Sequence, residues 1–345
     1  MKGIIAVAVS GGIDSLVAAY ILKKEGRQIT GLHFKTGYET KSAKESIDII
    51  AKQLDISIIT IDCAKEFKSK VVDYFTKTYL AGKTPNPCMV CNQLIKFGTI
   101  LSCAREIGAS SLATGHYARI IKDNNGSLHL LKSVDKIKDQ SYFLARLTQE
   151  QLSAAMFPLG NFTKTEVKNM AKRAGLQAVV NNESQDICFI KGKTYGNFLT
   201  AQTGYKAKTG DIVNGSGNVI GKHNGLHLFT IGQRRGINCP APKPYYVVGI
   251  DPEHNRLTVG SSLDLLSTGL KAININWIIQ PPDSAISVDT RIRGRHVPVP
   301  SKLYPTGRET AEIIFEKPQS AVTPGQGAVF YKGNEVLGSG WIEKL

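Results

Sequence analysis

The chain has 345 residues, of which 42% are hydrophobic, and carries a formal net charge of +15 from 43 basic and 28 acidic side chains. This length exceeds one typical domain and predicts two or three. No run of about 18 apolar residues is present, and the N-terminus enters a strand-like segment directly, so we expect a cytoplasmic protein without a membrane span. The positive charge favours a polyanionic partner, although a basic surface that serves only solubility is an alternative.

The first motif follows an apolar run at residues 3–9 and reads Ser-Gly-Gly-Ile-Asp-Ser at residues 10–15. Two glycines admit backbone angles that let successive N–H groups converge on an anion, and the helix that follows adds its positive end. The motif is neither a Walker loop nor a dinucleotide-binding fingerprint. It favours a phosphate-binding strand–loop–helix over an ordinary Gly-rich turn.

Strand-like and helical segments alternate through the first part of the chain. The strand-like segments are residues 4–9, 28–35, 56–62 and 111–114, with helical patterns between them and at residues 141–147 and 163–174. This alternation predicts an α/β fold with a doubly wound parallel sheet, whose ligands bind at the carboxyl ends of the strands.

The pattern changes near residue 204, where Gly, Asn and Pro begin to separate short strand-like runs. From about residue 270 all the predicted elements are strands, including one at residues 289–295. We therefore expect a catalytic domain at residues 1–203, a small mixed central domain at residues 204–269 and a C-terminal β-barrel at residues 270–345.

Three cysteines lie in unusual local sequences. Cys88 and Cys91 form a C-x-x-C pair after a rigid Thr-Pro-Asn-Pro loop, and Cys188 follows the polar residues 184–186. A packed core thiol is the alternative for each. The remaining cysteines match no motif and are expected in cores; they are Cys63, Cys103 and Cys239.

Together these segments resemble the tRNA-specific 2-thiouridylase family of the PP-loop ATP pyrophosphatases. The resemblance covers the whole chain and includes Ala-Thr-Gly-His-Tyr at residues 113–117, Lys-Asp-Gln-Ser-Tyr-Phe at 138–143 and Ile-Cys-Phe-Ile at 187–190. It continues through Gly-Gln-Arg-Arg-Gly at 232–236, Tyr-Val-Val at 246–248 and Val-Thr-Pro-Gly-Gln at 322–326.

The resemblance implies ATP- and Mg²⁺-dependent 2-thiolation of the wobble uridine through an adenylated uridine. It assigns catalytic roles to Asp14 in the phosphate loop, to Cys188 as a persulfide carrier and to Cys91 as the thiol that forms a transient disulfide with Cys188. The ATP-binding positions that it implies are Ala8, Val9, Ser10, Gly11, Gly12, Ile13, Asp14, Ser15, Phe34 and Gly115.

The implied partners are tRNAs of the Lys, Glu and Gln type and a sulfur donor such as a cysteine desulfurase or a sulfur-relay protein. An enzyme of this kind must extract its target base from the stack. For His116 the structural alternative is an ordinary histidine at the end of a strand. For Arg291 and Arg293 it is the solvated face of a strand. The positions implied in target-base and tRNA contact are Asn86, Pro87, Cys88, His116, Lys138, Asp139, Gln140, Arg291, Arg293 and Gln326.

The chain departs from the family pattern at Cys88, where an aspartate is common. Cys88, Cys91 and Cys188 together are a candidate ligand set for a [4Fe-4S] cluster that holds a hydrosulfide on its open iron. The alternatives are the persulfide route, with Cys88 as a bystander or redox partner, and a structural zinc, which we disfavour. A second departure is the short segment at residues 35–40.

Two other functions compete with uridine 2-thiolation. One is a different PP-loop adenylating enzyme, such as a tRNA 2-thiocytidine synthetase. The other is a non-catalytic RNA-binding module that kept the fold. The retained Ser10, Asp14, Cys91 and Cys188 argue against a binding module, because binding alone needs no sulfur-transfer pair.

Overall fold

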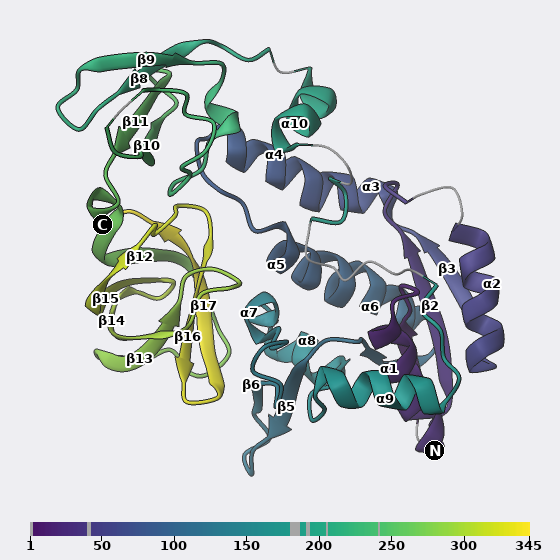
Figure 1. Cartoon of the computed structure of the whole chain (residues 1–345). Coiled ribbons are helices and arrows are strands. Elements are labelled where there is room, and N and C mark those ends of the chain that lie inside the picture. Colours follow the sequence, from purple (N-terminus) through teal and green to yellow (C-terminus); the bar gives the residue numbers. More distant parts are fainter. Residues whose placement is uncertain (1–2, 40–42, 180–186, 191–193, 205, 241) are drawn as a thin grey trace.

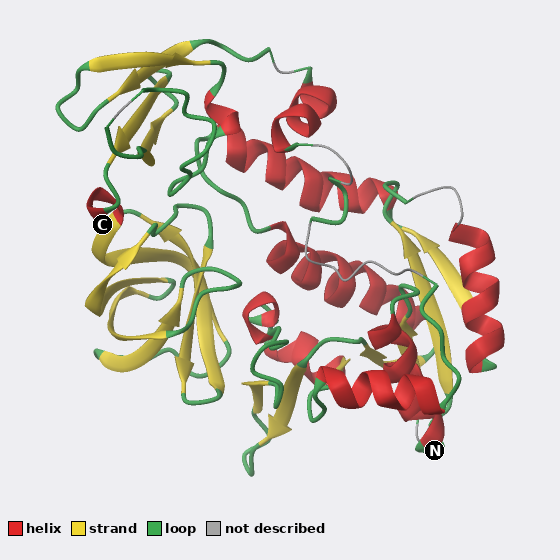
Figure 2. Ribbon diagram, viewed as in Figure 1, coloured by secondary structure: helices red, strands yellow, loops and turns green. Residues whose placement is uncertain are grey.

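The structure is a computed structural model that describes residues 3–39, 43–179, 187–190, 194–204, 206–240 and 242–345. It has an N-terminal α/β part, a small central sheet and a C-terminal barrel (Figure 1). Helices are concentrated in the N-terminal part, and strands dominate the other two (Figure 2). This confirms the predicted fold class. Within the described residues, no helix is both long enough and apolar enough to cross a membrane.

The N-terminal sheet is parallel and has the order β3-β2-β1-β4-β7. The order reverses between β1 and β4, so the sheet is doubly wound with a switch point there. The predicted strands are confirmed to within a few residues. The bounds are Ile4–Ala8 for β1, Ile29–Lys35 for β2, Ile58–Asp62 for β3, Ala109–Ala113 for β4 and Ala155–Met156 for β7.

Helices cover both faces of this sheet, because the side chains of its central strand alternate between two cores. Ala6 and Ala8 belong to one core, with side chains from α4, η2 and α6. Ile5, Val7 and Val9 belong to the other, with side chains from α1, α2 and α9. A strand buried on both faces reads as an unbroken apolar run, as residues 3–9 do.

The helices follow the predicted pattern at several points. Thr163 and Glu166 form a capping box at the start of α9, in which each side chain accepts a hydrogen bond from the other residue's backbone N–H. The helices of this part are α1 Ile13–Lys24, α2 Ala43–Leu54, α3 Ala64–Phe67, η1 Lys68–Val72, α4 Asp73–Leu80, α5 Pro87–Cys91, η2 Asn92–Ile100, α6 Leu101–Glu106, α7 Ser141–Leu144, α8 Gln149–Ala154, α9 Lys164–Arg173 and α10 Tyr195–Thr203.

The central part is a four-stranded sheet with the order β10-β11-β8-β9 around its own apolar core. One 3₁₀ turn, η3, lies between β9 and β10, and a second, η4, follows β11. Its elements are β8 Gly210–Val213, β9 Val219–His223, η3 Leu226–Leu228, β10 Tyr246–Asp251, β11 Arg256–Gly260 and η4 Leu263–Leu265.

The C-terminal strands form an antiparallel barrel that closes where β12 pairs with β17. The strand predicted at residues 289–295 ends at Arg291, so only its first half is extended. The strands are β12 Leu266–Trp277, β13 Ile286–Arg291, β14 Val299–Gly307, β15 Thr310–Ser320, β16 Gly327–Lys332 and β17 Glu335–Glu343.

One connection was not predicted. The hairpin of β5 (Ala118–Lys122) and β6 (Leu128–Lys132) leaves the N-terminal part and pairs with β17 of the barrel. The register sets Leu131 opposite Glu335 and Leu130 opposite Val336. The hairpin therefore extends the barrel sheet and joins the two parts through backbone hydrogen bonds.

Candidate active site

The phosphate loop lies at the switch point of the parallel sheet, directly after β1. Gly11 has a φ of 82°, which favours glycine. The Ser10 N–H donates to Ser15 Oγ at 3.2 Å, and the Ser15 hydroxyl donates to the Gly12 carbonyl at 2.8 Å. Gly12 is the N-cap of α1 and supplies no side-chain cap. The loop is therefore pre-shaped, with the start of a 12-residue helix directed at a prospective anion.

Gly115 lies at the end of β4 and packs against the first turn of α1. A Cβ at this position would lie 2.8 Å from both the Asp14 carbonyl carbon and the Ser15 nitrogen, so only glycine fits without a backbone shift. Phe34, the other residue predicted to contact adenosine, is partly buried on β2 against the first core. Both adenosine contacts stay predictions.

Asp14 is held by two residues that the sequence analysis did not single out. The Lys164 ammonium lies 2.7 and 2.8 Å from its two carboxylate oxygens, and the Tyr117 hydroxyl donates to Oδ1 at 2.8 Å. The Lys164 side chain is only 12% exposed. The helical pattern at residues 163–174 predicted that Lys164 would lie at the start of a helix. Nothing in the sequence indicates that this residue reaches α1.

The C-x-x-C pair lies on α5, where a capped start fixes the helix. Asn86 is its N-cap, and its Oδ1 accepts from the Met89 N–H at 3.3 Å, while Pro87 takes the first helical position. Asn86 is buried and also donates to the Tyr142 hydroxyl at 3.3 Å. Cys88 is exposed and Cys91 is partly buried. Of the three positions predicted to meet the target base, Cys88 has solvent access in this structure.

Cys188 is exposed beside a residue that is firmly anchored. Phe189 is 5% exposed and packs edge-on against Phe67 and Phe75, with ring centroids 5.7 and 5.3 Å apart. Buried Ile190 follows it. Phe189 and Ile190 thus hold the segment to the core while Cys188 keeps solvent access. Residues 184–186 of this motif lie outside the described residues.

The structure brings the three motif thiols within electrostatic reach of one another. Burial among protein atoms raises the pKa of Cys91 to about 12, with Lys96 opposing this and Cys188 and Cys88 adding to it. Burial and then Cys188 raise the pKa of Cys88 to about 11, although this residue keeps solvent access. The Cys88 and Cys91 thiols are therefore mostly protonated at neutral pH, and forming either thiolate needs a nearby positive charge.

The cluster prediction is not supported by this arrangement. Among the described residues, no group of three His, Cys, Asp or Glu side chains is placed to hold a metal ion. Cys88, Cys91 and Cys188 are near one another but do not form such a set, so we derive no step through an iron–sulfur cluster. The expected core thiols differ in burial: Cys63 is buried, whereas Cys103 and Cys239 are partly exposed.

His116 is buried, which does not suit direct contact with RNA in this conformation. Its Nδ1 lies 2.7 Å from Thr114 Oγ1, and its Nε2 lies 3.3 Å from the Lys96 ammonium. Burial and the neighbouring Lys96 charge hold the pKa of His116 well below its usual value. The ring is therefore neutral, and Nε2 accepts a hydrogen bond from Lys96.

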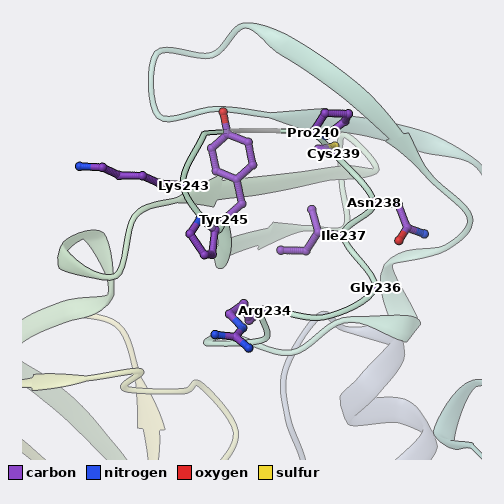
Figure 3. Close-up of a pocket in the computed structure, with 9 residues that line it drawn as sticks. Arg234, Gly236, Ile237, Asn238, Cys239, Pro240, Lys243 and Tyr245 are labelled. Carbon is purple, nitrogen blue, oxygen red and sulfur yellow. The ribbon is translucent and has the colours of Figure 1, made fainter.

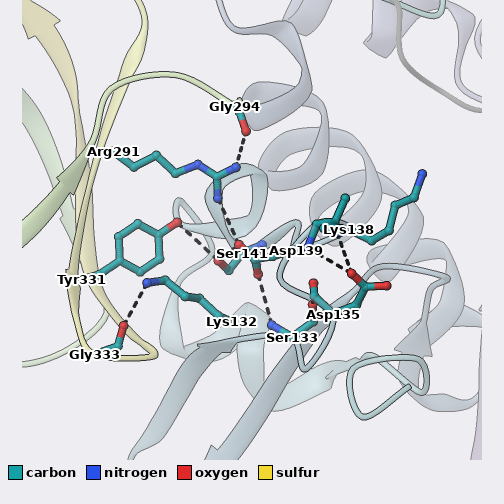
Figure 4. Close-up of polar contacts among 11 residues, drawn as sticks. Lys132, Ser133, Asp135, Lys138, Asp139, Ser141, Arg291, Gly294, Tyr331 and Gly333 are labelled. Carbon is teal, nitrogen blue, oxygen red and sulfur yellow. Dashed lines mark hydrogen bonds and ion pairs between the residues drawn. The ribbon is translucent and has the colours of Figure 1, made fainter. Parts of the chain in front are cut away.

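Asp139 and Arg291 form a polar joint between the N-terminal part and the barrel (Figure 4). Arg291 Nη1 donates to Asp139 Oδ2 at 3.0 Å, and the two side chains are 12% and 5% exposed. Asp139 also accepts from the Ser133 and Ser141 backbone and from the Ser141 hydroxyl, and the Arg291 guanidinium donates to the Gly294 carbonyl. Both residues were predicted to contact tRNA, but here they are occupied within the protein.

The other predicted tRNA positions divide between exposed and occupied residues. Gln326 Nε2 donates to the Pro85 carbonyl at 2.9 Å, which joins the barrel to the loop before the thiols. Gln140 Oε1 accepts from the Tyr117 N–H at 3.0 Å. Lys138 is partly buried and Arg293 is exposed. Arg293 is thus accessible to a polyanion, while Gln326 and Gln140 hold neighbouring loops.

The central part contains a pocket of about 400 Å³ (Figure 3), and neither the motif thiols nor the phosphate loop is among its lining residues. Arg234, Lys243 and Tyr245 are among its lining residues. The Gly-Gln-Arg-Arg-Gly motif contributes one wall, which the sequence resemblance noted without assigning it a role.

A parallel sheet with a Ser/Gly phosphate loop at its switch point, followed by two β-rich parts, defines the class of PP-loop α/β enzymes with appended barrels. Family models agree with each part. The tRNA methyl transferase HUP domain matches residues 3–192, the tRNA methyl transferase PRC-barrel domain matches 179–261, and the aminomethyltransferase beta-barrel domain matches 267–342.

Curated relatives narrow this class. The chain is 49% identical over 339 residues to a tRNA-specific 2-thiouridylase from Desulfosudis oleivorans, with 98% of this chain and 94% of the relative covered. Relatives of the same name from Geotalea uraniireducens and Geobacter metallireducens are 43% and 44% identical, with 98% of this chain and 94% and 96% of those chains covered. The chain belongs to the tRNA-specific 2-thiouridylase family.

Proposed function

We propose that this protein is an ATP-dependent enzyme that replaces the 2-oxygen of the wobble uridine of tRNA with sulfur. The observation that carries the proposal is the placement of Cys91 and Cys188. Both motif thiols lie close enough to influence each other electrostatically, in a chain that also has a preformed phosphate loop. The high identity to 2-thiouridylases does not favour the 2-thiocytidine synthetase or a non-catalytic module.

The first step activates a poor leaving group. The uridine 2-oxygen attacks the α-phosphate of ATP, the bond to the β-phosphate breaks, and pyrophosphate leaves as uridine N3 loses its proton. Ser10, Ser15 and the start of α1 would bind the departing phosphates, and Mg²⁺ bound with ATP supplies further charge neutralisation. Asp14 would orient this assembly, with Lys164 as its countercharge.

The second step transfers sulfur and needs no iron–sulfur cluster. An external donor loads Cys188 as a persulfide. The Cys91 thiolate attacks the inner sulfur, forms the Cys91–Cys188 disulfide and releases hydrosulfide. Hydrosulfide attacks C2 of the adenylated uridine and expels AMP, and a dithiol reductant then restores the two thiols.

The positive charge of the chain and the exposed Arg293 support a tRNA partner. Acceptors of the Lys, Glu and Gln type, a cysteine desulfurase or relay protein as sulfur donor, and a cytoplasmic location belong to the same proposal. Lys138 and Arg293 remain proposed tRNA contacts. Asp139, Gln140, Arg291, His116 and Gln326 would contact RNA only after a rearrangement.

The direct test supplies ATP, Mg²⁺, a sulfur source and unmodified tRNA, followed by digestion and mass spectrometry. The proposal predicts 2-thiouridine at the wobble position together with equimolar pyrophosphate. A thiolated cytidine, or tRNA binding with no thiolated product in any tRNA tested, would contradict it.

A further inference from the structure

Lys96 is a residue to which neither the sequence motifs nor the family resemblance gave a role. It lies on η2, the π-helical segment that continues α5 without a break. Backbone hydrogen bonds in a π-helix join residues five apart, so Cys91 and Lys96 fall about one turn apart on the same side of this helix.

The Lys96 ammonium is held in place from the end of β4. It donates to His116 Nε2 at 3.3 Å, and the opposite ring nitrogen of His116 lies 2.7 Å from Thr114 Oγ1. Thr114 and His116 are both buried, at 3% and 8% exposure. A neutral imidazole fixes the position of the ammonium without cancelling its charge.

No carboxylate neutralises this charge within the part of the chain that the structure describes. The contrast is Lys164, whose ammonium is paired with both oxygens of Asp14. Lys96 is only partly exposed, so its charge is less well screened than that of a surface lysine. A fixed, partly buried cation without a counterion is suited to bind an anion that arises during the reaction.

The neighbours of Lys96 indicate which anion this is. Its charge acts on the thiols of Cys88 and Cys91 and opposes the effect of their burial. The phosphate loop has its own binding groups and its own lysine, Lys164. The charge of Lys96 thus acts on the motif thiols, whereas the carboxylate of the phosphate loop is already paired with Lys164.

We propose that Lys96, held by His116 and Thr114, is the catalytic cation of the sulfur-transfer step, where it stabilises the Cys91 thiolate and the hydrosulfide that this thiolate releases from Cys188. This inference rests on the proposed thiolation. It gives His116 a positioning role, because the ring acts through Lys96 and is buried away from RNA.

The test separates the two chemical steps in single-turnover reactions with persulfide-loaded enzyme, ATP, Mg²⁺ and unmodified tRNA. Pyrophosphate release reports adenylation, and 2-thiouridine formation reports sulfur transfer. Lys96→Met and Lys96→Gln remove the charge, Lys96→Arg keeps it, and Lys70→Met is a matched control. Lys70 also approaches η2, at 3.3 Å from Thr99 Oγ1, but it is not among the main influences on the pKa of Cys88 or Cys91.

We expect Lys96→Met and Lys96→Gln to slow sulfur transfer by roughly 10²-fold, the usual effect of removing one preorganised charge-stabilising group, with pyrophosphate release within about threefold of the unsubstituted enzyme. Lys96→Arg should recover most of the rate, and Lys70→Met should not change it. Intact pyrophosphate release shows that each variant is folded.

Sulfur transfer at the unsubstituted rate in an adenylation-competent Lys96→Met enzyme would overturn the inference. An equal loss of both steps in Lys96→Met and Lys96→Gln would also overturn it, because it would place the charge at the phosphates. Failure of the unsubstituted enzyme to form 2-thiouridine is a separate result, which would reject the proposed function itself.

Discussion

The polar joint of Asp139 and Arg291 and the thiol site of Cys91 and Lys96 use charge in opposite ways. In the joint, a buried cation meets a buried carboxylate, and backbone and hydroxyl donors satisfy the remaining carboxylate sites. In the thiol site, the cation meets a neutral imidazole, and burial disfavours the anionic form of the nearby thiols. The Asp139 carboxylate already has its cation, whereas Lys96 has no carboxylate partner among the residues that the structure describes, so its charge is available for a reacting group.

The difference shows what a sequence motif can and cannot indicate. The motif Lys-Asp-Gln-Ser-Tyr supplies Asp139 to a joint between two parts of the protein. The motif Pro-Cys-Met-Val-Cys supplies the sulfurs themselves, and the charge beside them comes from Lys96, which lies outside that motif. Four substitutions separate these roles, beginning with the largest expected effect.

Cys188→Ser should reduce 2-thiouridine formation by roughly 10³-fold or more, because it removes the sulfur carrier itself. Affinity for tRNA should stay within a few-fold of the unsubstituted value, measured by filter binding. Cys239→Ser, in the central part, is the control and should retain activity. Comparable activity in both variants would show that Cys188 carries no sulfur.

Lys164→Met should slow pyrophosphate release by roughly 10²-fold, because Asp14 loses its countercharge and the phosphates lose a nearby cation. tRNA adenylated beforehand should still accept sulfur from this variant, measured as 2-thiouridine per enzyme. Lys172→Met, in the last turn of the same helix, is the control. If adenylation survives and sulfur transfer is lost, Lys164 belongs to the thiol site.

Arg291→Met should lower the free energy of unfolding by about 3 kcal/mol, because it leaves the Asp139 carboxylate buried without its cation. Urea unfolding measures the change. Exposed Arg293→Met should alter stability by less than about 0.5 kcal/mol but weaken tRNA binding and reduce its salt dependence. Equal free energies of unfolding for Arg291→Met and Arg293→Met would show that the Asp139–Arg291 pair does not stabilise the fold.

Gln326→Ala should lower the free energy of unfolding by about 1 kcal/mol, the usual contribution of a side-chain hydrogen bond, because it removes the bond to the Pro85 carbonyl. Urea unfolding again provides the measurement. A loss of tRNA affinity without a loss of stability would instead favour direct RNA contact by Gln326.

The fold was predictable because its signals are local. The apolar run at residues 3–9, the capping box of Thr163 and Glu166, and the glycines of the phosphate loop each specify their own element. The β5–β6 hairpin joins the barrel through pairing with β17, about 200 residues away, which no local pattern encodes.

The site was predictable only in part, for the same reason. The motifs located Ser10, Cys91 and Cys188. The contacts of Lys164 with Asp14 and of Arg291 with Asp139 link residues 150 and 152 positions apart, and they appear only when the fold is known. Lys96 carries no signal in the sequence, because a lysine on a helix is ordinarily a solvated residue.

The measurement that tests the account most directly is a single turnover with Cys188 preloaded as a persulfide and the sulfur donor removed. After ATP, Mg²⁺ and tRNA are added, mass spectrometry quantifies 2-thiouridine and the linked Cys91–Cys188 peptides. The account predicts one 2-thiouridine and one such disulfide per active enzyme. Formation of 2-thiouridine without the disulfide, in proportion to bound iron and sulfide, would contradict it.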